Sequence, residues 1–150
     1  MTLKLNIDTR SWRNHIKELH EEFPGLVPVA KGNGYGFGLD VLAREAARLK
    51  DDCLAVGTAH EVAKVRDAGW SRDVIVLNPW RPFDETATVL IDDPQIITVV
   101  SRLEDLDELR KKHPRARVVA ELMTSMRRYG ITPEEIESVD AGSLGFEGWT

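Results

Sequence analysis

The sequence predicts an α/β fold built around a parallel β-sheet, and three observations lead to this prediction. Six short apolar runs are rich in β-branched residues, which is typical of buried strands. Segments with helical periodicity separate these runs. The runs begin at residues 27, 54, 74, 96, 118 and 144, so they recur at intervals of 20 to 27 residues. Strands and helices that alternate this regularly imply βα units joined by right-handed crossovers.

The six predicted strands share a length of four to six residues and a high content of Val, Ile and Leu. They cover residues 27–31, 54–58, 74–77, 96–100, 118–122 and 144–149. Apolar and polar residues do not alternate cleanly along them. We therefore expect helices to cover one face of the sheet and further structure to bury the other.

The predicted helices have recognisable first turns. Three segments match the capping box, in which a Thr or Ser hydroxyl and a Glu three residues later bond reciprocally to backbone N–H groups: 58–61, 101–104 and 132–135. A helix is also expected before the first strand, because Trp12, Ile16, Leu19 and Phe23 fall on one stripe that ends at Pro24. A further helix is expected over 83–90.

Two architectures accommodate this alternation. One is an open doubly wound sheet, which would be complete at this length. The other is a (β/α)8 barrel of the TIM type, which needs about 250 residues and would be incomplete in 150. Periodicity alone does not separate them.

Composition limits the classes of partner. Acidic side chains outnumber basic ones by 25 to 20, which gives a net charge of −5 and argues against binding to nucleic acid. Cys53 is the single cysteine, and no Cys/His cluster has metal-ligand spacing, so we expect no disulfide, no metal site and a reducing cytoplasmic location. The first ten residues lack the apolar core of a signal peptide. No apolar run approaches the roughly 18 residues of a membrane span.

The segment over 27–38, VPVAKGNGYGFG, is the most informative part of the chain. An apolar strand ends at Lys31, and a glycine follows at every second position. Glycines permit unusual backbone angles and the close approach of a ligand, and both candidate architectures place active sites where parallel strands end. The glycine spacing fits neither the dinucleotide motif nor the P-loop. A lysine in this position can instead form a Schiff base with an aldehyde cofactor, although a solvated lysine before a loose turn would have the same composition.

This segment resembles the signature of the alanine racemase family, in which a strand ends in lysine and a tyrosine follows four residues later. Lys31 and Tyr35 have that spacing. The resemblance continues in order through LAVGT at 54–58 with Glu61, VIVL at 74–77 and MRRYGI at 126–131, and so covers nearly the whole chain.

The resemblance implies a role for each matching residue. Lys31 would hold pyridoxal 5'-phosphate as an aldimine and would act as acid or base on one face of the substrate. Tyr35 would hydrogen-bond the cofactor phosphate. Arg128 would lie beside the cofactor ring and the substrate carboxylate. Val29 and Leu77 match apolar positions near the cofactor, although both are equally compatible with the strand core.

The implied activity is a racemase that interconverts L- and D-alanine on an incomplete TIM-type barrel. Residues 1–150 would form the N-terminal part of that barrel, without its last strands and without a β-rich second domain that supplies the base for the other face. An incomplete barrel exposes strand edges, so we expect a homo-oligomer or a complementing chain. Three alternatives stay open: a non-catalytic pyridoxal-phosphate-binding or carrier protein, an inactive interaction fragment, and a decarboxylase on a related barrel.

Overall fold

A computed structural model describes residues 6–150 and contains one parallel sheet of five strands. The strands are β1 (Cys53–Val56), β2 (Asp73–Val76), β3 (Ile96–Val100), β4 (Arg117–Ala120) and β5 (Gly145–Trp149). The sequence argument against a signal peptide concerns the first ten residues, and residues 1–5 of these lie outside the described range. No helix in the described range has the length and apolar character needed to cross a membrane.

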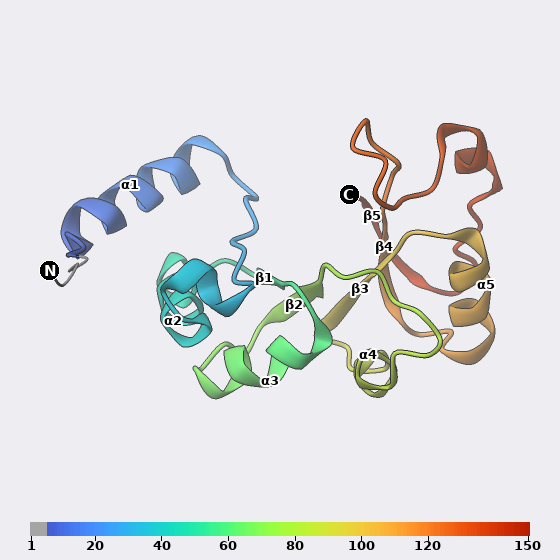
Figure 1. Cartoon of the computed structure of the whole chain (residues 1–150), viewed down its shortest axis with the longest axis horizontal. Coiled ribbons are helices and arrows are strands. Elements are labelled where there is room, and N and C mark those ends of the chain that lie inside the picture. Colours follow the sequence, from blue (N-terminus) through green and yellow to red (C-terminus); the bar gives the residue numbers. More distant parts are fainter. Residues whose placement is uncertain (1–5) are drawn as a thin grey trace, which may run out of the picture.

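The order of the strands distinguishes the two candidate architectures. They follow the chain as β1-β2-β3-β4-β5, and each strand pairs in parallel with the next. A doubly wound sheet reverses its strand order at a switch point, whereas a barrel adds each strand on the same side of the last. Figure 1 shows α2, α3, α4 and α5 following one another along one margin of the sheet. The fold is therefore a segment of a (β/α) barrel.

The predicted first strand over 27–31 is reduced to a single parallel bridge between Val29 and Ala55. The Ala30 N–H donates to the Ala55 carbonyl at 2.8 Å, and the Ala55 N–H donates to the Pro28 carbonyl at 2.9 Å. Pro28 has no N–H to extend the ladder, and the chain turns away after Lys31. Five strands and one bridge thus replace the six strands predicted, but Lys31 still leaves the edge of the sheet beside β1.

The described residues contain five α-helices and two 3-10 helices. They are α1 (Thr9–Glu22), η1 (Asn33–Gly36), α2 (Leu39–Leu49), α3 (Ala59–Asp67), α4 (Glu85–Leu90), α5 (Leu103–Lys112) and η2 (Pro133–Ser138). The capping boxes at Thr58 and Thr132 are confirmed. The one predicted at Ser101 is wrong, because Arg102 precedes the helix and the Ser101 hydroxyl accepts from Arg81 instead. The helix α2 lies between the first two predicted strands, where the alternation implies a helix, although no capping signal in the sequence marks its start.

The core lies between the sheet and its helices. Side chains of β1, β2, β3 and β4 meet those of α2, α3 and α5 in one buried cluster that includes Leu54, Val56, Val74, Val76, Val118, Val62, Val65, Leu106 and Leu109. All five residues of β3 are buried, whereas buried and half-buried residues alternate along β2 and β4. The expectation of burial on both faces therefore holds for β3 and for most of β1, where Leu54, Ala55 and Val56 are all buried. The helix α1 forms as predicted but buries no residue, and it projects from the end of the sheet in Figure 1.

Candidate active site

A cavity of about 310 Å³ lies where the parallel strands end. Its lining comes from the residues that directly follow β1, β2, β4 and β5, together with Val99 in β3 and Lys31 after the edge bridge. These residues include Lys31, Gly57, Leu77, Asn78, Glu121, Arg128 and Thr150. The carboxyl ends of parallel strands are where barrels place their active sites.

The turn after Lys31 depends on its glycines. Gly32, Asn33, Gly34 and Tyr35 all have positive φ angles between 54° and 61°, and the Gly34 N–H donates to the Lys31 carbonyl at 3.0 Å. A Cβ on Gly34 would lie 2.9 Å from the backbone nitrogen of Leu39. Four successive residues with positive φ, from Gly32 at the N-cap of η1 into η1 itself, reverse the chain directly after Lys31.

Arg128 reaches the cavity on a loop that leaves β4 and returns beside it. Leu122 and Ile131 form a bridge, the Met123 N–H donates to the Ile131 carbonyl at 2.8 Å, and the Ile131 N–H donates to the Glu121 carbonyl at 2.7 Å. These bonds hold the base of the loop closed. At its tip the Arg128 guanidinium lies 5.9 Å from the centroid of the Tyr129 ring, within the range of a cation–π contact.

Glu121 also lines this cavity, and sequence reasoning did not single it out. Its Oε2 atom is buried and accepts no hydrogen bond from the described residues. Burial raises the pKa of the Glu121 carboxyl, while the positive charges of Arg128 and Arg81 act in the opposite direction. The signal in the sequence was an acidic residue inside the apolar run over 118–122.

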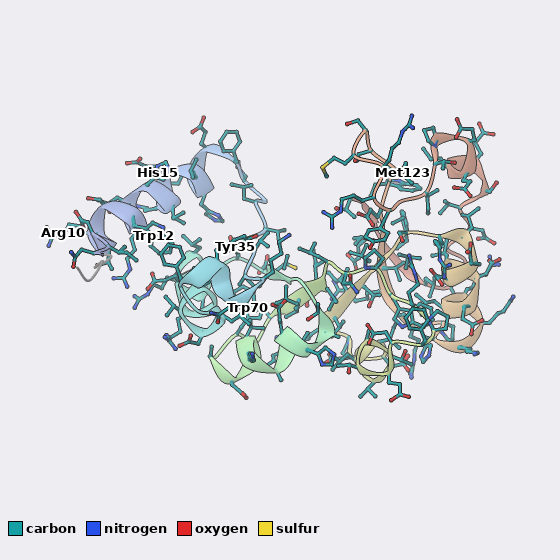
Figure 2. All side chains as sticks on the ribbon, viewed as in Figure 1. Arg10, Trp12, His15, Tyr35, Trp70 and Met123 are labelled. Atoms are coloured by element: carbon teal, nitrogen blue, oxygen red, sulfur yellow. The ribbon has the colours of Figure 1, made fainter. Side chains whose placement is uncertain are left out.

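The structure brings together three of the five residues proposed from the sequence. Lys31, Leu77 and Arg128 line the same cavity. Tyr35 does not line it, and its side chain is 60% exposed. Figure 2 shows Tyr35 at the α2 end of the molecule, away from Met123 in the loop that follows β4. Val29 instead lines a second cavity. The roles at the cofactor that the sequence suggests for all five residues stay predictions.

The second cavity, of about 600 Å³, lies between α1, α2 and the edge of the sheet. Its lining is largely apolar, with Trp12, Ile16 and Leu42 among its members. The charged groups at this cavity pair with each other, as Arg13 does with Glu45 at 2.6 Å. The smaller cavity lies at the carboxyl ends of the parallel strands and contains both Lys31 and Arg128, so we take it as the candidate active site.

Known proteins with similar sequences include alanine racemases. One, from Escherichia coli O6:H1, is 31% identical over 138 residues, which cover 88% of this chain and 37% of the relative. Another, from Deinococcus deserti, is 39% identical over 111 residues, or 73% of this chain and 30% of the relative. The chain thus spans well under half of the length of the relatives that it matches.

Solved structures agree on the fold. The crystal structure of alanine racemase from E. faecalis has a TM-score of 0.77 at 25% identity, covering 95% of this chain and 42% of its own. The alanine racemase from Corynebacterium glutamicum has a TM-score of 0.76 at 23% identity, covering 93% of this chain and 43% of its own. The fold is that of a TIM-type (β/α) barrel, incomplete in this chain.

A sequence model of one family covers most of the chain. It is described as the N-terminal domain of alanine racemase, and it matches residues 7–142. That match includes Lys31, Tyr35 and Arg128, and so spans both the turn after Lys31 and the loop that carries Arg128. The chain therefore belongs to the alanine racemase N-terminal domain family.

Proposed function

We propose that this chain is the N-terminal part of a pyridoxal-phosphate-dependent racemase that interconverts L- and D-alanine, with Lys31 as the residue that holds the cofactor. The observation that carries this proposal is the presence of Lys31 and Arg128 in one cavity at the carboxyl ends of the strands. Family membership makes an amino-acid isomerase the reaction class to test.

The residues present fit the proposed cofactor. A primary amine is what an aldehyde condenses with, and Lys31 is the lysine among the described residues of the cavity. The volume of about 310 Å³ lies within the range of small-molecule pockets, roughly 300 to 1,000 Å³. When bound, pyridoxal phosphate supplies an electron sink that acidifies the α-proton of an attached amino acid.

The side chains of the cavity have different proposed roles in the reaction. The Lys31 amine would take or return the α-proton from its side of the cavity. The planar guanidinium of Arg128 orients the substrate carboxylate through charge-assisted hydrogen bonds. The buried Glu121 carboxyl lies where it offsets part of the positive charge of Arg128. Leu77 and Val99 contribute apolar wall to the cavity.

Inversion at carbon needs a second acid or base on the opposite face of the substrate. We assign that group, with the remaining strands, to a part of the protein outside residues 1–150 or to a partner subunit. Residues 1–150 are on this proposal the N-terminal portion of the cofactor-binding barrel, acting in the cytoplasm as part of a homo-oligomer or with a complementing chain.

The experiment follows one face of the reaction, so that it does not require the whole protein. L-alanine is incubated in D2O with pyridoxal phosphate and the chain, and exchange of the α-proton is followed by NMR. We expect exchange above the rate of cofactor alone, its loss in Lys31→Ala, and its retention in Lys64→Ala, which removes an exposed lysine of α3. Arg128→Ala should slow exchange of alanine more than exchange of alaninamide, which has no carboxylate. Equal exchange by wild type and Lys31→Ala would refute the proposal.

A further inference from the structure

Glu61 makes more contacts than its helix needs. One carboxylate oxygen, Oε2, accepts from the backbone N–H groups of Gly57 at 2.7 Å and Thr58 at 3.0 Å. The other, Oε1, accepts from the N–H of Gly32 at 2.9 Å. Gly32 lies 29 residues earlier in the chain, on the segment that leads away from Lys31.

Helix capping accounts for only one of these three bonds. In a capping box the glutamate returns to the N-cap N–H, which here is the bond to Thr58. The second capping box, at Thr132, shows the simple case within the described residues, since Glu135 accepts only from Thr132, at 2.9 Å. The bonds from Glu61 to Gly57 and Gly32 therefore need another explanation.

The two additional hydrogen bonds join the segment that contains Lys31 to the turn before α3. The Gly32 N–H belongs to the peptide unit that begins at the Lys31 carbonyl, so its bond to Glu61 fixes the orientation of that peptide. On the same side, a Cβ on Gly57 would lie 3.1 Å from the Lys31 Cβ and 2.9 Å from Glu61 Oε2. Gly57 thus packs directly against the start of the Lys31 side chain, and Glu61 Oε2 lies beside Gly57.

We infer that Glu61 is a positioning residue for Lys31: its carboxylate ties the Lys31–Gly32 peptide to the turn between β1 and α3, and so aims the Lys31 amine into the cavity. A carboxylate suits this role because a backbone N–H bond to a charged acceptor is stronger than one to a neutral acceptor. Only one part of this inference rests on the proposed function, namely that the molecule captured by the Lys31 amine is pyridoxal phosphate.

The test compares Glu61→Ala and Glu61→Gln with Glu135→Ala, which removes the matching bond of the other capping box but lies on η2. The first measurement is the rate of reductive trapping of pyridoxal phosphate on the Lys31 peptide, relative to the exposed Lys111 in the same sample. The second, which needs no cofactor, is hydrogen exchange of the Gly32 amide by NMR. Circular dichroism establishes that each variant is folded.

We expect Glu61→Ala to slow trapping at Lys31 by about tenfold and to raise exchange of the Gly32 amide by a similar factor, because misplacing a reacting group carries penalties of this order or more. Glu61→Gln keeps one acceptor oxygen and should restore part of both effects. Glu135→Ala should change neither.

Two results would overturn the inference: trapping at the wild-type rate in Glu61→Ala, or an equal slowing in Glu135→Ala. If pyridoxal phosphate is not trapped on Lys31 of the wild-type chain at all, the proposed function fails. Hydrogen exchange of the Gly32 amide then tests the role of Glu61 by itself. An unchanged exchange rate in Glu61→Ala then rejects the tie, and a rise of about tenfold supports it.

Discussion

Replacing Gly130 by alanine should distort the loop that carries Arg128. Gly130 has a φ of +129°, and an added Cβ would lie 2.3 Å from both the Leu122 carbonyl carbon and the Met123 nitrogen. Carbon atoms in contact are normally about 3.5 to 4.0 Å apart, so the overlap exceeds roughly 1 Å. Both clashing atoms are backbone, and no rotamer change can move them.

The cost follows from two contributions. An alanine forced into this backbone region costs about 1 to 3 kcal/mol. Relieving the overlap would break the hydrogen bonds that close the loop, between Met123 and Ile131 and between Ile131 and Glu121, at about 1 kcal/mol each. We therefore expect Gly130→Ala to lower the free energy of unfolding by about 3 to 5 kcal/mol, a large fraction of ordinary domain stability.

Gly148→Ala is the matched control, because Gly148 has a φ of +135° and a Cβ added there would meet no atom within 4 Å. Only the backbone contribution applies at that position. Urea unfolding followed by circular dichroism should show Gly130→Ala to be about 2 kcal/mol less stable than Gly148→Ala, or roughly 4 to 8 °C lower in Tm. Equal losses in the two variants would refute the argument that the loop is closed against Gly130.

Three further predictions test other parts of the chain. Burial raises the pKa of the Cys53 thiol from 9.0 to about 11, so at pH 8 alkylation by iodoacetamide should be about a hundredfold slower in the folded chain than in urea, and similar rates would contradict this burial. Asp105 is 1% exposed and pairs with Arg81 and with Arg102, so Asp105→Asn should cost about 3 kcal/mol in urea unfolding. Glu104→Gln, which breaks an exposed pair with the same Arg102, should cost less than about 0.5 kcal/mol, and similar costs would count against the buried network. Burial raises the pKa of the Glu121 carboxyl above 4.5. The stability that its protonated form contributes is therefore present below pH 4.5 and is lost as the pH rises through the folded-state pKa. Glu121→Gln should gain stability over wild type towards neutral pH, and a stability difference independent of pH would contradict this.

Local signals in the sequence predicted the features that depend on local chemistry. The capping box at Thr58 forms as expected, because both of its partners lie within one turn of helix. The box predicted at Ser101 fails for a tertiary reason: Arg81, twenty residues earlier, takes the serine hydroxyl as an acceptor. The extent of the edge strand also depended on more than its apolar composition, since Pro28 allows only one bridge there.

Only the part of the candidate site that local motifs mark could be predicted from the sequence. Lys31 and Arg128 were marked by the motifs around them, and the end of a parallel strand brings both to one edge of the sheet. Glu121 was missed because its significance comes from burial of Oε2, which no local pattern records. The contacts of Glu61 with Gly32 join segments 29 residues apart and depend on the strand bridge that aligns them.

The proposed function requires the Lys31 amine to capture an aldehyde in the cavity at the ends of the strands. The most direct measurement is a mass-spectrometric peptide map of the chain after incubation with stoichiometric pyridoxal phosphate and reduction with borohydride. We expect the cofactor to be attached mainly to the peptide containing Lys31, and excess L-alanine added before reduction to remove it from that peptide. Attachment spread over surface lysines, with no preference for Lys31, would rule out this role of Lys31.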